Sequence, residues 1–313
     1  MRAQYIFEDA PFPSCHASTI VEVRPGTFLA AWFGGTDEGA PDVAIWMARW
    51  TGQSWSQPQK IADEPGVPCW NPVLFRERAG STVLFYKAGP SPQSWSGLVR
   101  LSDDGGDTWR PPRLLPAGLL GPIKNKPLQL ASGRIVAGTS VESYRTWAVW
   151  VETSDDGGDT WQRHGPIILP DELFGIIQPT IFQTKSGSLR MLTRSTRQIG
   201  QICSAVSNDE GTTWSGAERT ALANPNSGID AVRLTDGRIV LCHNPTHTGR
   251  TPLALSVSFD DGISWKAGPT LESNPGEYSY PAIIQAESGD VHVTYTWRRK
   301  RIRHWILSAE DLL

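Results

Sequence analysis

Apolar residues in this chain occur in short runs with period-two alternation, not at helical spacing. Examples are STVLFYKAG (81–89), GLVRLSDD (97–104) and RIVLCHN (238–244), which are bounded by Gly, Asp or Pro. Short alternating runs that end at turn residues are typical of β-strands, and helical periodicity does not extend over a useful length. The pattern therefore predicts an all-β protein.

A tryptophan-containing octet with the pattern S-x-D-x-G-x-[TS]-W recurs along the chain. Its four copies begin at residues 102, 154, 207 and 258, with spacings of 52, 53 and 51 residues. A fifth copy, ARWTGQSW (48–55), keeps the Gly, Ser and Trp but has lost the Asp. A unit of about 52 residues divides the 313-residue chain into six.

This period predicts a six-bladed β-propeller in which each unit is one four-stranded antiparallel blade. The last blade would combine C-terminal strands around VHVTYTWRRKRIRHWILS (291–308) with an N-terminal strand around AQYIFE (3–8). Such a join closes the ring and removes exposed sheet edges. We therefore expect residues 1–313 to form a single propeller domain.

The octet itself is best explained as a tight turn. Asp can bond to nearby backbone N–H groups, Gly tolerates positive φ, and the Trp can pack back against the blade. Calcium binding is the alternative, because DDGGD resembles an acidic metal loop. The octet lacks the 12-residue spacing and terminal Glu of an EF-hand, which favours the structural turn.

A second repeat lies upstream of the octets: a lead-in residue, a small residue or proline, an apolar strand and a Gly turn. Aligning the six copies on the small residue or proline predicts one equivalent lead-in position per blade. In a propeller the first strand of each blade lines the central channel, so these residues would surround one mouth. A packed core would not select such a polar set, although a water-filled channel with no further role would also fit. The six residues are His16, Asn71, Lys126, Gln178, Asp230 and Tyr280.

Loops and strand ends near these positions add further candidates. Asp37 lies in FGGTDEGAPD, and three cations lie in FYKAG, LTRS and NPTHTGR. Together with the lead-in lysine they indicate a site for an anionic ligand in a chain of net charge −3, because guanidinium groups bind carboxylates in bidentate fashion. The substrate-binding candidates are Asn71, Lys87, Lys126, Arg194, Asp230 and Arg250.

The octets match the Asp-box, or BNR, repeat, and over nearly its full length the chain resembles the sialidase (neuraminidase) superfamily of six-bladed propellers. The resemblance implies that Tyr280 is the catalytic nucleophile and Asp37 the acid/base. It also implies that Arg194 and Arg250 are the second and third arginines of a triad that binds the substrate carboxylate.

Two positions depart from the family pattern. His16 stands in CHAST where the family has the arginine of an Arg-Ile-Pro motif, and Gln178 in IIQPT replaces the Glu that activates the nucleophile. A Tyr hydroxyl, with a pKa near 10, needs a base or a lowered pKa to attack at neutral pH, and an amide cannot act as that base. The catalytic candidates are therefore Tyr280, Asp37, His16 and Gln178.

Three functions remain open. The first is an exo-acting glycoside hydrolase that releases a terminal acidic sugar, such as a sialic, ulosonic or uronic acid, from an oligosaccharide or glycoconjugate. The second is a lyase that cleaves a uronate by β-elimination, with His16 and Tyr280 as base and acid. The third is a noncatalytic carbohydrate-binding propeller.

Composition and charge limit the classes of binding partner, location and cofactor that we expect. A net charge of −3 and a pI near 6.1 provide no basic surplus for nucleic acid or an anionic membrane. The N-terminal residues contain no apolar run of signal-peptide length, so we expect a cytoplasmic protein. The four cysteines lie far apart, which predicts free buried thiols, and we expect no metal or cofactor. His292 and His304 are expected to be structural or exposed.

Overall fold

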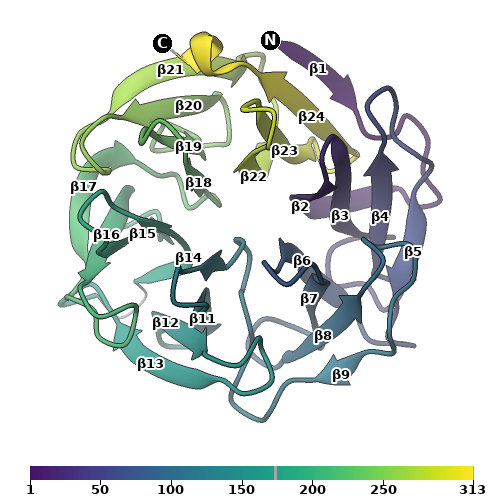
Figure 1. Ribbon diagram of the computed structural model, residues 1–313, viewed down its shortest axis with the longest axis horizontal. Coiled ribbons are helices and arrows are strands. Elements are labelled where there is room, and N and C mark those ends of the chain that lie inside the picture. The colour runs from purple at the N-terminus through teal and green to yellow at the C-terminus, as the bar shows by residue number, and fades with distance from the viewer. Residues whose placement is uncertain (173–174, 313) are drawn as a thin grey trace. The chain divides into compact units, whose positions relative to one another are not determined.

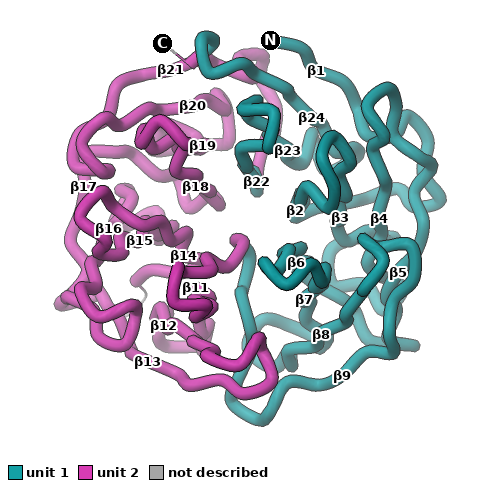
Figure 2. The backbone as a smooth tube through the Cα atoms, viewed as in Figure 1, with its two compact units in different colours: residues 1–124, 280–311 teal, residues 125–279, 312–313 magenta. Residues whose placement is uncertain are grey.

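The computed structural model describes residues 1–172 and 175–312 (Figure 1). Within this part of the chain the regular structure is β-strand, apart from one short 3-10 helix at the C-terminus, η1 (Ala309–Leu312). In the same part, helices of the length and apolarity needed to cross a membrane are absent. The chain divides into two compact units, unit 1 (residues 1–124 and 280–311) and unit 2 (residues 125–279 and 312–313) (Figure 2).

Unit 1 contains three four-stranded antiparallel sheets, and in each the strands follow one another by hairpin connections or by the terminal closure. The first sheet is β2 (Ser14–Arg24), β3 (Thr27–Gly35), β4 (Ala44–Trp50) and β5 (Gln59–Ala62). The second is β6 (Cys69–Arg76), β7 (Thr82–Ala88), β8 (Ser96–Ser102) and β9 (Arg113–Leu114). The third is ordered β1 (Arg2–Tyr5), β24 (Arg301–Leu307), β23 (Val291–Trp297) and β22 (Tyr278–Gln285).

The third sheet contains the terminal closure that the sequence predicts. β1 pairs antiparallel with β24, so that Arg2 lies opposite Ile306 and Tyr5 opposite Arg303. The pairing continues past the strand, where the Ile6 amide donates to the Ile302 carbonyl at 2.9 Å. The strand from one end of the chain thereby completes a blade built from the other end.

Unit 2 contains the other three sheets, each in simple sequence order. The first is β10 (Leu128–Gln129), β11 (Ile135–Glu142), β12 (Trp147–Ser154) and β13 (Gln162–Ile167). The second is β14 (Ile176–Gln183), β15 (Leu189–Ser195), β16 (Gln201–Ser207) and β17 (Glu218–Ala223). The third is β18 (Asp230–Arg233), β19 (Ile239–His243), β20 (Leu253–Ser258) and β21 (Lys266–Glu272).

The apolar runs of the sequence form the core of each unit. In unit 1, Leu29, Ile45 and Leu84 are buried in one cluster, and in unit 2 Val136, Val149 and Met191 occupy an equivalent cluster. Burial of such aliphatic side chains contributes on the order of 2 kcal/mol each. The prediction of an all-β fold with six four-stranded antiparallel blades, the fold class of the six-bladed β-propeller, is confirmed.

The repeated octets form the turns that follow the third strand of a sheet. In the turn that begins at Ser154, the Asp156 carboxylate accepts bonds from the Thr160 amide (2.9 Å) and hydroxyl, and the Ser154 hydroxyl accepts one from the Gly158 amide (2.8 Å). These bonds, with Thr160 the largest contributor, lower the pKa of Asp156 to about 2. The Trp161 indole donates to the Gly158 carbonyl (3.0 Å). In this turn the octet bonds to its own backbone, which supports an architectural role.

All four cysteines are buried as free thiols. Burial raises the pKa of the Cys69 thiol to about 12 and raises that of Cys15 still further. Thiols in this state pack as small apolar side chains, as the sequence predicts.

Candidate functional site

Three of the first strands carry a β-bulge near their start. The pairing register shifts between His16 and Thr19 in β2, between Trp70 and Val73 in β6, and between Ile177 and Thr180 in β14. One residue in each bulge has a positive φ that L-amino acids rarely adopt, and Tyr280 at the same place in β22 has φ 53°. Bulges re-aim side chains and recur at functional sites, and a positive φ in a bulky residue stores strain. The residues in question are Ala17, Asn71, Gln178 and Tyr280.

The bulges correct the predicted register in the first blade. By strand pairing, the residue equivalent to Asn71 and Gln178 is Ala17, while His16 corresponds to Trp70 and Ile177. Aligning on the small residue misplaced this blade by one position, because the sequence CHAS has no proline to mark the bulge. His16 still lies next to the bulge, but it occupies the position one residue before the predicted one.

The other two lead-in positions also differ from the bulged ones. Asp230 begins β18 in regular pairing with Cys242, and Lys126 precedes β10. The structural equivalence that the sequence predicts therefore holds among Asn71, Gln178 and Tyr280.

In unit 1 the structure brings His16 and Tyr280 together. Their ring centroids lie 4.1 Å apart at an interplanar angle of 51°, and the side chains are 1% and 8% exposed. The His16 Nδ1 atom is 3.0 Å from the Thr296 hydroxyl oxygen, which also accepts a bond from the Ala17 amide. In the tautomer in which Nδ1 donates to Thr296, Nε2 is the ring nitrogen that can accept a proton.

Lys124 lies beside Tyr280 of this pair. Its ammonium lies 5.8 Å from the centroid of the Tyr280 ring and donates to the Pro281 carbonyl, and the residue is 3% exposed. A cation over an aromatic face is attracted by the ring quadrupole, and burial strengthens that attraction. The contact with Pro281 also ties Lys124 to the strand that positions Tyr280.

Lys87 is the cation of β7 that the sequence predicts to bind substrate. It is fully buried, and its ammonium donates to the carbonyl of Pro122. The ammonium holds the loop that carries Pro122 in this structure, and the substrate-binding role of Lys87 remains a prediction. A strand pattern does not reveal which face of β7 is covered by a loop.

Asn71 lies at the bulge of β6 and is 5% exposed. The neighbouring Trp70 packs edge-on against Trp95 and donates its indole N–H to the Gly89 carbonyl at 2.8 Å. The surroundings of Asn71 are therefore held rigidly, and its substrate-binding role remains a prediction.

Asp37 is exposed in the loop after β3, and the loop is ordered by its own polar groups. The Asp42 carboxylate accepts bonds from the Thr36 hydroxyl (2.7 Å) and amide, which lower the pKa of Asp42. The adjacent Glu38 forms an ion pair with Arg299, and the Asp37 carboxylate accepts the Glu38 amide at 2.8 Å. Asp37 is thus presented to solvent on a fixed loop, as an acid/base candidate requires.

In unit 2 the structure joins Gln178 and Arg194, the two candidates that lie on neighbouring strands. The Gln178 amide oxygen accepts a bond from Arg194 Nη1 at 3.1 Å, and Arg194 Nε donates to the Asn226 amide oxygen at 2.7 Å. Both of these partners are neutral, so they orient the guanidinium without neutralising its charge. A carboxylate at position 178 would instead have formed an ion pair.

Lys126 and Asp230 form an ion pair at 2.9 Å in unit 2, and Lys126 also donates to the Ala231 carbonyl. The second oxygen of the buried Asp230 accepts the Thr180 hydroxyl at 2.8 Å. Arg250 is likewise paired with an acid, Glu277, at 2.8 Å. The charges of these two cations are therefore balanced within the protein.

The sequence analysis did not identify several residues that contact the predicted site residues. Thr296 and Arg299 lie on and after β23, a strand examined only for its role in closing the blade. Glu277 lies three residues before Tyr280 in GEYSY, where a search for an acid near the predicted nucleophile would have found it. The contact of Asn226 with Arg194 had no sequence signal, because it depends on the loop before β18.

Comparison with known proteins identifies a family model and relatives that are similar to this chain. The BNR repeat-like domain model matches residues 26–293. A sialidase of Vibrio cholerae is 30% identical over 166 residues, which cover 43% of this chain and 21% of the relative. The chain therefore spans about a fifth of the length of that curated relative.

Solved structures share the fold at low sequence identity. A Dyadobacter fermentans protein of unknown function has a TM-score of 0.83 at 18% identity and covers 97% of each chain. The NanB sialidase of Streptococcus pneumoniae has a TM-score of 0.82 at 15% identity, covering 99% of this chain and 71% of that one. With a family model that matches most of its length, the chain belongs to the BNR repeat-like domain family.

Proposed function

We propose that this protein is a glycoside hydrolase that releases a terminal acidic sugar from an oligosaccharide or glycoconjugate. Membership of the BNR repeat-like domain family and the similarity to the Vibrio cholerae sialidase support the general class. The single observation that carries the proposal is the buried His16–Tyr280 pair, with ring centroids 4.1 Å apart. The pair supplies a nucleophile and a proton acceptor within one unit.

His16 replaces the missing activating carboxylate in this proposal. Tyr280 must lose its phenolic proton as its oxygen attacks the anomeric carbon, and the Gln178 amide cannot accept that proton. Imidazole is the side chain best suited to accept a proton near neutral pH. The Thr296 contact at Nδ1 holds the ring so that Nε2 serves this role.

The remaining roles follow the sequence predictions. Asp37 donates a proton to the leaving oxygen as the glycosidic bond breaks, and the same group later takes a proton from the water that releases the sugar. In unit 2, Arg194 is the candidate for the substrate carboxylate, since its contacts with Gln178 and Asn226 fix the orientation of a guanidinium that can bind a carboxylate in bidentate fashion. Arg250 and Lys126 would first have to leave Glu277 and Asp230.

Elimination on a uronate is the second candidate, and the position of Lys124 favours it. An ammonium 5.8 Å from the Tyr280 ring centroid places a cation beside Tyr280, where it would stabilise a substrate carboxylate. His16 would take the proton from the carbon next to that carboxylate, the C–O bond to the leaving group would break, and Tyr280 would protonate the leaving oxygen. The product gains a carbon–carbon double bond and no water is consumed.

One experiment separates these reactions. Purified protein is incubated with a panel of acidic oligosaccharides that end in sialic, ulosonic or uronic acids, and products are followed by mass and by near-ultraviolet absorbance. Hydrolysis adds the mass of water without new absorbance, whereas elimination creates an absorbing unsaturated uronate. Tyr280→Phe is expected to lower either activity by about a thousandfold or more.

Tyr295→Phe is the matched control. Tyr295 is a fully buried tyrosine on β23 of the same blade, and its hydroxyl accepts the Trp305 indole N–H at 3.0 Å. Its loss tests packing and stability without touching the His16–Tyr280 pair. Equal activity in Tyr280→Phe and Tyr295→Phe, or unmodified substrate across the panel, would contradict an enzymatic function for this centre.

A further inference from the structure

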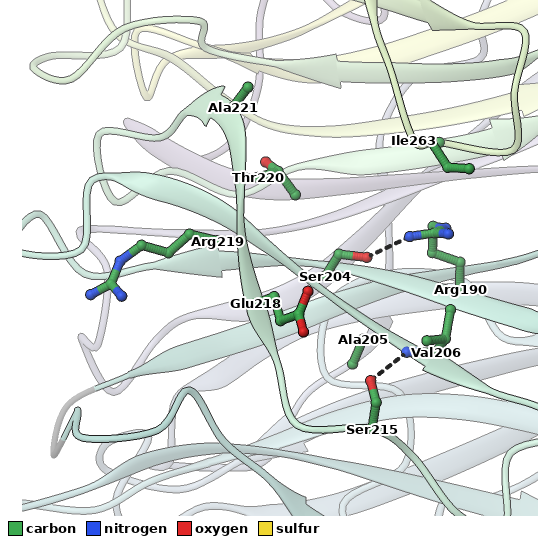
Figure 3. A pocket seen from close by; sticks show the side chains of 11 residues that line it. Arg190, Ser204, Ala205, Val206, Ser215, Glu218, Arg219, Thr220, Ala221 and Ile263 are labelled. Atoms are coloured by element: carbon green, nitrogen blue, oxygen red, sulfur yellow. Dashed lines mark hydrogen bonds between the residues drawn. The ribbon is translucent and has the colours of Figure 1, made fainter.

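A cavity of about 400 Å³ lies in unit 2, away from the residues discussed above. It is bordered by β15, β16, β17 and the octet turn that follows β20 (Figure 3). Its volume is at the lower end of the range of small-molecule pockets, about 300–1,000 Å³, and suits one or two sugar residues. None of the candidate site residues predicted from the sequence lines it. The residues that matter here are Arg190, Ser204, Val206, Glu218 and Ile263.

Two opposite charges face this cavity without forming an ion pair in the described part of the chain. Arg190 Nη1 donates to the Ser204 hydroxyl at 3.3 Å, and its buried Nε atom has no hydrogen-bond partner among the described residues. Glu218 is exposed at the start of β17. Figure 3 shows Arg190 and Glu218 on opposite sides of Ser204. A ligand that both accepts and donates hydrogen bonds would bridge the two groups.

The charge balance favours a neutral ligand. Arg219, the other cation at the cavity, is directed away from Arg190 in Figure 3 and pairs with Glu172 at 2.5 Å. One guanidinium and one carboxylate then remain to face the interior. Neighbouring hydroxyl groups on a sugar match this pair, because each hydroxyl can accept from Arg190 and donate to Glu218.

Apolar groups complete the lining. Ala205 and Val206 lie on β16, and Ile263 comes from the octet turn with its side chain 72% exposed. The exposed Ile263 side chain offers an apolar surface at the edge of the cavity, and covering it would remove apolar area from water. The C–H face of a sugar ring would provide that cover.

A second cavity, in unit 1, also lies next to an octet turn and differs from the first in its charges. There the equivalent octet turn places Gly106 and Asp107 over a cavity of about 310 Å³. Arg49 lines this cavity, forms an ion pair with Asp107 at 2.8 Å and donates to the Gly105 carbonyl. Ile263 occupies the octet position of Asp107, so in unit 2 the turn supplies no acid to neutralise Arg190.

We propose that the cavity around Arg190 and Glu218 is an accessory binding site for a neutral sugar residue of a glycan. Arg190 and Glu218 bind adjacent hydroxyl groups, and Ile263 packs against the sugar ring. The site is independent of the proposed catalytic residues, and it would hold a glycan chain whether or not the protein cleaves it.

Binding is tested with methyl α-glucoside, methyl α-mannoside and lactose as neutral probes and inorganic phosphate as an anionic probe. Full-length protein labelled at isoleucine methyl groups is titrated, and the Ile263 methyl signal is followed with Ile168, 44% exposed, as an internal reference. We expect at least one saccharide to shift Ile263 and leave Ile168 unchanged. Arg190→Met and Glu218→Gln should each weaken that binding about tenfold or more.

Two further variants complete the test. Glu310→Gln removes an exposed carboxylate outside the cavity and should leave binding unchanged, and Tyr280→Phe should bind as wild type, which separates this site from the proposed function. Absence of a saccharide-dependent Ile263 shift would overturn the proposal. Phosphate binding that needs Arg190 but not Glu218 would also overturn it, since the cavity would then be an anion site.

Discussion

Unit 1 contains two buried histidine centres that differ in how they are built. His16 lies at a bulge beside Tyr280, with a hydroxyl contact at one ring nitrogen. His292 and His304 instead contact each other, with Nδ1 and Nε2 3.0 Å apart and the rings stacked at 5.1 Å. Both centres are almost inaccessible to water. Burial alone therefore does not identify a catalytic histidine.

The surroundings of the second centre explain its role. His292 stacks on Phe28 at 4.1 Å, and His304 Nδ1 is 3.3 Å from the Trp55 indole nitrogen. Burial lowers the pKa of His292 to about 4, and burial with the neighbouring His292 lowers that of His304 further. This pair is neutral, lies on β23 and β24, and holds the closing blade together. Strained backbone and a tyrosine neighbour distinguish the first centre.

The strongest test of this distinction removes the His16 imidazole. His16→Asn should lower turnover by about a hundredfold to ten-thousandfold, the usual contribution of a general base, while the unfolding midpoint changes little. The acidic limb of the pH–rate profile should be lost as well, because an amide does not titrate. His292→Phe, in the closing blade, should retain wild-type turnover, and a loss equal to that of His16→Asn would erase the distinction.

The fold was predictable because its signals are local. The octet spacing and the alternating strands define the blades, and the complementary terminal strands predict the β1–β24 pairing. Each octet closes its own turn with Ser, Asp and Thr side chains within a few residues. Information of this kind survives in a single sequence because the interacting residues are adjacent in the chain.

The site was predictable only in part because its contacts are long-range. The pairing of His16 with Tyr280 joins residues 264 positions apart, and the burial of Lys87 depends on a loop 35 positions away. The register in the first blade failed at Ala17, where positive φ appears without the proline that marks other bulges. Acidic partners such as Glu277 decide whether a cation is available, and although Glu277 is visible near Tyr280 in the sequence, its pairing with Arg250 cannot be derived from the strand pattern.

Acid should destabilise the closing blade through His292. Since the folded pKa of His292 is about 4 and that of a free histidine is 6.5, the unfolded chain binds more protons in this range. The contribution of His292 to the free energy of unfolding is therefore fully present above about pH 6.5. It falls by about 3 kcal/mol as the pH drops toward 4. Denaturant unfolding at several pH values measures the slope. His292→Phe should flatten it by about one proton, and an unchanged slope in that variant would assign the effect elsewhere.

The smallest expected effect concerns Thr296, which orients His16 without touching a substrate. Thr296→Val preserves volume but removes the contact with His16 Nδ1 and the bond from the Ala17 amide. We expect turnover to fall about tenfold, which corresponds to about 1.4 kcal/mol, with KM unchanged and partial rescue by Thr296→Ser. Thr294→Val is the matched control, since Thr294 is buried two residues away on β23 and its hydroxyl has no hydrogen-bond partner among the described residues. If both valine variants lost turnover equally, the effect would come from strand packing and not from the orientation of His16.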